Sequence, residues 1–281
     1  MHGRHDLPWR LTRDPYAILV SEVMLQQTQV ARVVPYFLRW LERWPSLESL
    51  AGATPAEVIE AWGGLGYNRR ALSLHRLARQ VVERHAGRLP LSLAGLLALP
   101  GIGPYTANAV LSFACDLPAP VADTNIARVL VRLLAGFEFA RETRPVEVDV
   151  LAKQFLPTTN ARDHNLALMD LGAIVCTPRD PSCRTCPLAG RCRWRLAGSP
   201  RGTAGQALAV RFEATARFAR GRIVDALRSA ESLSSGEIAG LLPPLHAARA
   251  EQYLAALARD GLLVERADGR WSLPGRNVRA G

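Results

Sequence analysis

"LPGIGPYTAN", residues 99–108, separates two stretches with helical periodicity and holds two glycines around one isoleucine. Glycine permits a tight turn and leaves the backbone N–H groups of that turn uncovered. Because the N-terminus of the next helix adds its positive dipole end, the turn of Gly101, Ile102 and Gly103 can hold a phosphate without selecting a base sequence. Such a turn alone is also typical of a plain helix connector, so its function depends on the surrounding sequence.

The composition is that of a folded protein, and its positive charge indicates a polyanionic partner. The chain has 281 residues, a length sufficient for two or three domains. Of these residues, 48% are hydrophobic and 21% are charged, as in ordinary folded proteins. The net charge of +10 favours nucleic acid over a membrane surface, because no basic amphipathic surface helix stands out. The chain shows no apolar run long enough to span a bilayer and no signal-peptide pattern. We therefore expect a cytoplasmic, nucleoid-associated protein with no membrane partner.

Helical periodicity dominates the first two-thirds of the chain, with short loops that contain Gly, Pro, Asn or Asp. One expected helix runs over residues 16–34. After a Gly/Ser/Pro-rich linker at 198–210, the remainder predicts three helices and a β-hairpin that turns at Asp268-Gly269. This is the order of a winged-helix domain, which would contact DNA, dock a partner or stabilise the chain as a small appendage.

Four of the five cysteines are close together, with the spacing Cys176-x6-Cys183-x2-Cys186-x5-Cys192. In a chain without a secretion signal, this favours a metal site over a disulfide framework. Four thiolates suit either tetrahedral zinc or an iron–sulfur cluster. Common zinc ribbons carry a C-x2-C pair at both ends, whereas this chain has one such pair. The compact, asymmetric spacing therefore favours a [4Fe–4S] cluster.

Several motifs together resemble the helix-hairpin-helix (HhH-GPD) DNA glycosylase superfamily, and within it the MutY-like branch. In family order and spacing they are LPWR (7–10), SEVMLQQTQV (21–30), GLGYNRRA (64–71), LPGIGPYTA (99–107), DTNIARV (123–129), LMDLGAIVC (168–176) and the four-cysteine loop. The resemblance implies a mainly α fold with a six-helix barrel at 15–130. Residues 1–14 and 131–197 would form a [4Fe–4S] cluster domain. The winged-helix-like α+β domain at 211–281 stands where this branch usually has a larger, Nudix-like domain.

The resemblance implies that a base is everted from duplex DNA and that its N-glycosidic bond is cut. Glu22 matches the acid that protonates the departing base, and its apolar neighbours should raise its pKa. Asp123 matches the carboxylate beside the oxocarbenium-like sugar, held ionised by a helix N-terminus, and Asn125 would orient the reacting groups. Tyr105 stands where lyase-type members carry a lysine. Because the only lysine is the distant Lys153, we predict hydrolysis without efficient AP-lyase activity.

Further residues are assigned to the DNA and to the everted base. Predicted DNA contacts are the hairpin residues Gly101, Ile102 and Gly103, the wedge residues Gln27 and Tyr67 of the resemblance, and the neighbouring Arg69. The resemblance places Arg10, Leu25, Val30 and Leu166 in the base pocket. Leu166 departs from the branch, which usually has Gln or Glu there to hydrogen-bond the adenine edge.

We therefore expect a monofunctional DNA glycosylase of base excision repair that acts as a monomer on double-stranded DNA with a mismatched or damaged base. The favoured substrate is adenine opposite guanine or 8-oxoguanine. Leu166 also resembles the sister branch that removes thymine or uracil, so a glycosylase for these or other deaminated bases is the alternative. A non-catalytic, cluster-bearing DNA-binding regulator is a third hypothesis, which the presence of both Glu22 and Asp123 disfavours.

Overall fold

The computed structural model describes residues 3, 5–200 and 210–276, and it is mainly helical with two short strands. The chain forms two compact units. The first unit consists of Met1–Glu22, Pro90–Ala98 and Ile102–Gln206. The second unit consists of Val23–Leu89, Leu99–Gly101 and Ala207–Gly281. These units cut the sequence differently from the predicted domains, whose boundaries stay a prediction, and residues 201–209 of the predicted linker lie outside the described residues.

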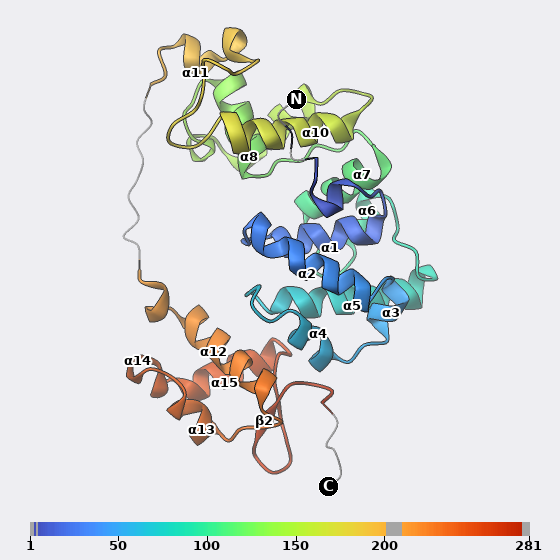
Figure 1. Ribbon diagram of the computed structural model, residues 1–281, viewed down its shortest axis with the longest axis vertical. Coiled ribbons are helices and arrows are strands. Elements are labelled where there is room, and N and C mark those ends of the chain that lie inside the picture. Colours follow the sequence, from blue (N-terminus) through green and yellow to red (C-terminus); the bar gives the residue numbers. More distant parts are fainter. Residues whose placement is uncertain (1–2, 4, 201–209, 277–281) are drawn as a thin grey trace. The chain divides into compact units, whose positions relative to one another are not determined.

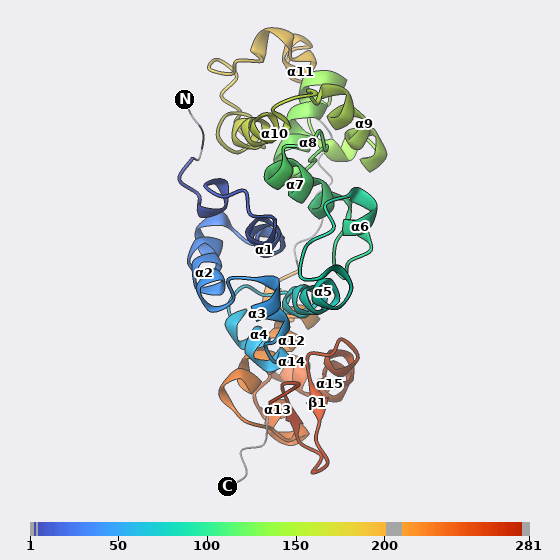
Figure 2. The ribbon, with the colours of Figure 1, turned by 90° about the vertical axis from the view of Figure 1, so that its right-hand side faces the viewer.

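The described part of the first unit contains helices and no strand. Its helices are η1 (Pro8–Arg10), most of α1 (Pro15–Leu25), α6 (Leu93–Leu97), α7 (Pro104–Cys115), α8 (Thr124–Leu130), η3 (Ala140–Glu142), α9 (Pro145–Phe155), α10 (Ala161–Asp170), η5 (Ala189–Arg191) and α11 (Arg193–Leu196). Proline occupies the first position of α7, where its missing N–H costs nothing. The helices α8 and α10 each continue into a π-helical turn, η2 (Val131–Ala135) and η4 (Leu171–Val175), and they pack together with α7 (Figure 2).

The second unit contains α2 (Val30–Arg43), α3 (Leu47–Ala51), α4 (Pro55–Ala61), α5 (Arg69–His85), η6 (Phe212–Ala214), α12 (Ala216–Ser229), α13 (Ser235–Gly240), α14 (Pro244–Ala247), α15 (Ala250–Arg259), β1 (Val264–Glu265) and β2 (Trp271–Ser272). Capping boxes at Ser46, Thr54 and Ser234 fix the starts of α3, α4 and α13. The two strands are antiparallel, with Val264 opposite Ser272. The predicted helices followed by a hairpin are found, with the short α14 in addition.

The C-terminal helices share a hydrophobic core with α4 and α5. Ala56, Ile59 and Leu72 pack in one cluster with buried residues of α12 and α15, such as Ile223 and Leu254. In Figure 1 the orange and red C-terminal elements lie next to α4 accordingly. This shared core holds residues 216–273 against α4 and α5 as one packed body. Each Å² of apolar surface buried in it contributes about 25 cal/mol to stability.

Two local features decide the backbone near the predicted site. The expected single helix over 16–34 is wrong: α1 ends at Leu25, α2 begins at Val30, and Gln27 between them has a left-handed φ of 56°. The turn of the "LPGIGPYTAN" hairpin is found between α6 and α7, with Gly101 at φ 78°. A Cβ at Gly101 would lie 2.7 Å from Cβ of Ser73 on α5, so glycine is required there by both conformation and space.

Among the described residues, no helix is long and apolar enough to cross a membrane.

Candidate active site

A buried carboxyl group and a phenol form the centre of the candidate site. Glu22 lies on α1 with only 5% of its surface exposed, and Tyr105 lies in the first turn of α7. The Tyr105 hydroxyl donates a hydrogen bond of 2.8 Å to Oε2 of Glu22. The hairpin thus places the residue after its second glycine and proline directly against the acid predicted from the sequence.

Burial controls the protonation of this pair. Desolvation raises the pKa of Glu22 to about 7, the Tyr105 hydrogen bond opposes that rise, and the nearby Asp123 adds to it. The predicted rise in pKa is therefore confirmed. The pKa of Tyr105 lies well above its usual value of 10, first because the phenol is buried and then because both carboxylates lie near it. Tyr105 consequently remains a hydrogen-bond donor across the physiological pH range.

Asp123 is the N-cap of α8, as its sequence context predicted. Its carboxylate accepts hydrogen bonds from the backbone N–H of Ile126 at 2.7 Å and from Nδ2 of Asn125 at 3.1 Å. These bonds and the charge of Arg128 lower the pKa of Asp123, but desolvation outweighs them and leaves the pKa above its ordinary value. The net direction is thus opposite to the expectation from the helix N-terminus alone.

A chain of hydrogen bonds runs from Asp123 to the cysteine loop. Oδ1 of Asn125 accepts from Nη2 of Arg128 at 2.8 Å. The same guanidinium donates to the carbonyl oxygens of Gly172 at 2.6 Å and Cys176 at 2.7 Å. Arg128 is not among the site residues predicted from the sequence, although its position three residues after Asn125 puts both on one helix face.

Gly172 lies in the LMDLGAIVC motif (168–176), but the sequence assigns it no role. A Cβ at this glycine would lie 2.7 Å from Cβ and 2.8 Å from the carbonyl oxygen of Asn125. Any side chain at position 172 would therefore displace the first turn of α8. The close approach of η4 to α8 needs a glycine, and it brings the Gly172 carbonyl within reach of Arg128.

The four cysteines of the loop are free thiols, each partly buried. Burial raises the pKa of Cys183, and the other three cysteines raise it further through their charge, so the four side chains lie near one another. Arg132 donates a hydrogen bond of 3.4 Å to Sγ of Cys176, and its own carbonyl oxygen lies 3.4 Å from Sγ of Cys192. Two of the four thiols therefore contact one buried arginine.

The donor set fits an iron–sulfur cluster in its chemistry. Across residues 5–200 and 210–276, no group of three or more His, Cys, Asp or Glu side chains is arranged as a metal-ion site. A [4Fe–4S] cluster binds one thiolate at each of four irons, so its cysteines surround a cube and do not converge on one point. Four neighbouring thiols with no disulfide between them, next to a cationic Arg132, have the composition that such a cluster needs.

Comparison with known proteins finds a matching family and similar full-length chains. The profile of the HhH-GPD superfamily of base excision DNA repair proteins matches residues 20–144. The adenine DNA glycosylase of Mycolicibacterium smegmatis is 44% identical over 279 residues, which are 98% of this chain and 93% of that protein. The adenine DNA glycosylase of Mycobacterium tuberculosis strain H37Rv is 41% identical over 280 residues, covering 97% of this chain and 90% of that protein.

The chain belongs to the HhH-GPD superfamily of base excision DNA repair proteins. The resemblance to this superfamily and to its adenine DNA glycosylases is confirmed. The human adenine DNA glycosylase is 44% identical over 202 residues, which are 68% of this chain and 37% of that protein.

Two solved structures share the fold. A thermostable thymine-DNA glycosylase superposes with a TM-score of 0.64 and 33% identity, covering 69% of this chain and 90% of that one. A trapped endonuclease III–DNA covalent intermediate gives a TM-score of 0.59 and 25% identity, covering 67% and 88%. The mainly helical HhH-GPD fold predicted from the sequence is therefore confirmed.

The two predicted wedge residues of this HhH-GPD protein share an unusual backbone. Gln27 and Tyr67 are both exposed, and both have left-handed φ values, of 56° and 48°. Non-glycine residues adopt this conformation at a cost of about 1–3 kcal/mol, and such strain is concentrated at functional sites. Four other non-glycine residues share this conformation, so it does not by itself set these two turns apart: Ala86, Asp116, Asn160 and Ser199.

Arg70 holds both turns in place. Its Nη1 donates to the carbonyl oxygens of Val23, Met24 and Gln26 at 2.6–3.0 Å, in the turn that contains Gln27. Its Nη2 donates to the carbonyl oxygens of Leu65 and Gly66 at 3.0–3.1 Å, next to Tyr67. Burial lowers the pKa of Arg70 only to about 10, so the side chain stays charged at neutral pH. In contrast, the side chain of the adjacent Arg69 is 71% exposed.

The predicted pocket residues have different surroundings. Arg10 forms a two-fold ion pair with Asp170, with N–O distances of 2.7 and 2.8 Å and side chains only 11% and 12% exposed. Leu166 on α10 is partly buried in the first unit, and Leu25 and Val30 are partly buried in the second. A common pocket for these residues stays a prediction.

Proposed function

We propose that this protein is an adenine DNA glycosylase that hydrolyses the N-glycosidic bond of adenine mispaired with guanine or 8-oxoguanine. The observation that carries the proposal is the buried Glu22, hydrogen-bonded to Tyr105 and close enough to Asp123 to feel its charge. The similarity to adenine DNA glycosylases over 97–98% of the chain supports the choice of base. One chain carries all three side chains, so we propose that the monomer is active.

The proposed reaction uses the two carboxyl groups in different protonation states. Glu22, with a pKa of about 7, gives its proton to a ring nitrogen of the departing adenine as the bond between base and sugar breaks. Asp123 remains anionic and stabilises the positive charge that develops on the sugar. A water molecule then adds to the sugar carbon and passes its proton to the Glu22 carboxylate. This restores the acid and leaves an abasic site and free adenine.

Tyr105 supports hydrolysis rather than lyase chemistry in this proposal. A Schiff base with the sugar needs an amine, and a phenol held to Glu22 cannot supply one. The only lysine of the chain, Lys153, is an exposed residue of α9. We therefore propose that the product strand stays intact until alkali or another enzyme cuts it.

We further propose that Cys176, Cys183, Cys186 and Cys192 hold a [4Fe–4S] cluster. When bound, the cluster would cross-link the cysteine loop and supply a site for one-electron chemistry. Arg132 would offset the negative charge of the four thiolates, since it already donates to Sγ of Cys176. The loop so held would fix the Cys176 carbonyl oxygen, to which Arg128 donates.

Leu166 supports a second candidate substrate. A leucine cannot hydrogen-bond the edge of adenine, and the loss of one polar contact lowers discrimination by about 1–3 kcal/mol. The thymine-DNA glycosylase among the similar structures agrees with a pocket for thymine or uracil opposite guanine. Adenine remains the first choice because the near full-length relatives are adenine DNA glycosylases.

A panel of labelled duplexes tests these proposals. Duplexes with A·G, A·8-oxoguanine, T·G, U·G or hypoxanthine are incubated with the protein and divided into samples with and without hot alkali. Alkali-dependent cleavage of the adenine strands alone is the expected result, and Glu22→Gln should abolish it. Cleavage at T·G or U·G alone would favour the second candidate. Strand cleavage without alkali would contradict the role given to Tyr105.

A further inference from the structure

An exposed guanidinium lies against two aromatic side chains in the second unit. Arg217, in the first turn of α12, has its guanidinium carbon 4.9 Å from the ring centre of Tyr67 and 4.7 Å from that of Phe212. It also donates a hydrogen bond to the Tyr67 hydroxyl. The two aromatic residues are 42% and 47% exposed, so the whole cluster of Tyr67, Phe212 and Arg217 faces solvent.

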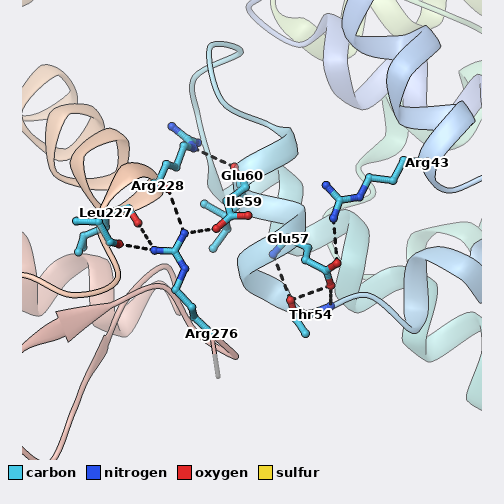
Figure 3. A network of polar contacts seen from close by, with 9 residues as sticks. Arg43, Thr54, Glu57, Ile59, Glu60, Leu227, Arg228 and Arg276 are labelled. Carbon is cyan, nitrogen blue, oxygen red and sulfur yellow. Dashed lines mark hydrogen bonds and ion pairs between the residues drawn. The ribbon is translucent and has the colours of Figure 1, made fainter. Parts of the chain in front are cut away.

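The C-terminal helix that carries Arg217 is fixed to the loop that carries Tyr67. Nη2 of Arg228, at the other end of α12, donates to Oδ1 of Asn68 at 2.8 Å, and its Nε donates to the carbonyl oxygen of Ile59 at 3.0 Å. Arg276 adds an ion pair to Glu60 on α4 (Figure 3). Both ends of α12 therefore contact the segment 59–68, and these contacts hold Arg217 beside Tyr67.

Among the described residues, no carboxylate neutralises Arg217. In contrast, Arg69 and Arg220 each form an ion pair with Asp260. No carboxylate of the described residues lies within ion-pair distance of Arg217, whose partners there are two rings and a hydroxyl. Stacking uses the faces of a guanidinium and leaves N–H groups at its edge, which match the geometry of a phosphate. Exposed aromatic rings interleaved with arginine are typical of nucleic-acid surfaces.

We propose that the C-terminal domain binds duplex DNA directly, through contact of Arg217 with a backbone phosphate beside Tyr67. The inference rests on the proposed function, in which duplex DNA is the substrate. It assigns the winged-helix-like domain to DNA contact, one of the roles that its sequence left open. Phe212 and Tyr67 both contact the guanidinium, and these two contacts restrain its orientation.

Salt-dependent binding tests the proposal. The probe is a fluorescent duplex with 2′-fluoro-2′-deoxyadenosine opposite guanine, because the fluorine slows loss of the base. Its Kd is measured with the full chain between 50 and 200 mM KCl. Each lost phosphate contact lowers the slope of log Kd against log salt by about 0.9. Arg217→Ala should show this fall, whereas Arg217→Lys should keep the slope of the unaltered protein.

The same measurement in the Tyr67→Ala protein separates a direct contact of Arg217 with DNA from an effect of Arg217 on Tyr67. The fall in slope for Arg217→Ala should recur when Tyr67→Ala is already present. The matched control is Arg249→Ala, because Arg249 is also an exposed arginine over a tyrosine ring, that of Tyr253, in the same domain. Thermal unfolding midpoints confirm that each variant is folded.

The outcomes are distinct for the two proposals. An Arg217→Ala slope equal to that of the unaltered protein and of Arg249→Ala would overturn the DNA contact, and so would a fall that disappears in the Tyr67→Ala background. If Arg217→Ala lowers the slope of log Kd against log salt as expected, but the unaltered protein releases adenine from no duplex, the DNA contact is supported and the proposed function is contradicted.

Discussion

The Tyr105 hydroxyl donates its hydrogen bond to Glu22 over 2.8 Å, although 82 residues separate the two in the sequence. The bond favours the charged form of Glu22, whereas burial favours the neutral form and is the larger effect. The result is a carboxyl group with a pKa of about 7, close to the value that serves an acid at neutral pH. Through Tyr105, the hairpin therefore moderates the rise in pKa that burial causes at Glu22.

Tyr105→Phe should move the pH dependence of the reaction. Loss of a hydrogen bond that lowers the pKa of Glu22 raises that pKa further, so the acid stays protonated to a higher pH. The single-turnover rate of base release, which should fall as pH rises through about 7 in the unaltered protein, should then fall at a higher pH. Rates between pH 5 and 9 measure the shift, and an unchanged alkaline limb would show that Tyr105 does not act on Glu22.

Glu22→Gln should remove activity and stabilise the protein at high pH. The folded pKa of about 7 exceeds the ordinary value of 4.5, so the native state holds the proton more tightly than the unfolded state. Glu22 therefore costs stability increasingly as pH rises from 4.5 through 7, to a limit of about 3 kcal/mol. Urea unfolding at pH 8 should show this gain for the variant, with little gain at pH 4.5.

Glu83→Gln provides the control for that measurement, because Glu83 is 60% exposed on α5. Its free energy of unfolding should change by no more than about 0.5 kcal/mol at either pH. An equal gain for both variants at pH 8 would assign the effect to net charge, not to the buried position of Glu22.

The chemistry of the site could be predicted from the sequence because it depends on residue types in short motifs. Burial of Glu22 follows from its apolar helical neighbours, and the capping role of Asp123 follows from its position before a helix. The net pKa direction of Asp123 could not be predicted. It depends on how deeply α8 is covered by segments distant in sequence, and the local helix N-terminus gives only the smaller, opposing effect.

Long-range contacts explain the other differences from the prediction. The helical pattern continues through residues 26–29, yet the backbone breaks there. Arg70, more than 40 residues away, takes up the carbonyl oxygens of Val23, Met24 and Gln26 that a continuing helix would use. The need for glycine at position 172 likewise arises only where η4 meets Asn125 in space. Neither relation has a periodicity or a spacing by which it could be found.

Gly172→Ala should slow catalysis without weakening DNA binding. The added methyl group must displace Asn125, which donates to the Asp123 carboxylate at 3.1 Å. An overpacked contact of this kind costs about 1–3 kcal/mol. If that cost falls on the placement of Asp123 in the transition state, the single-turnover rate should fall about 5- to 150-fold. Gly190→Ala is the control, since a Cβ there meets no atom within 4 Å.

Arg128→Lys should lower the single-turnover rate as Gly172→Ala does, because Arg128 also contacts Asn125. A lysine keeps the charge but cannot donate to Asn125, Gly172 and Cys176 at once, as the guanidinium does. Single-turnover rates and the Kd for an uncleavable duplex separate a defect in chemistry from one in binding. A normal rate in Arg128→Lys would show that the chain of hydrogen bonds to the cysteine loop does not position Asp123.

Arg70→Ala should destabilise the fold, because it leaves several carbonyl oxygens of two left-handed turns without their donor. Each such unsatisfied group costs about 1–3 kcal/mol, so the free energy of unfolding should fall by at least about 3 kcal/mol. Arg69→Ala, which alters an exposed neighbour, should change it by no more than about 0.5 kcal/mol. Arg70→Lys keeps the charge without the fork of donors, so urea unfolding should place it between Arg70→Ala and the unaltered protein. Equal stability of Arg70→Ala and Arg69→Ala would show that the turns around Gln27 and Tyr67 hold their backbone without the guanidinium.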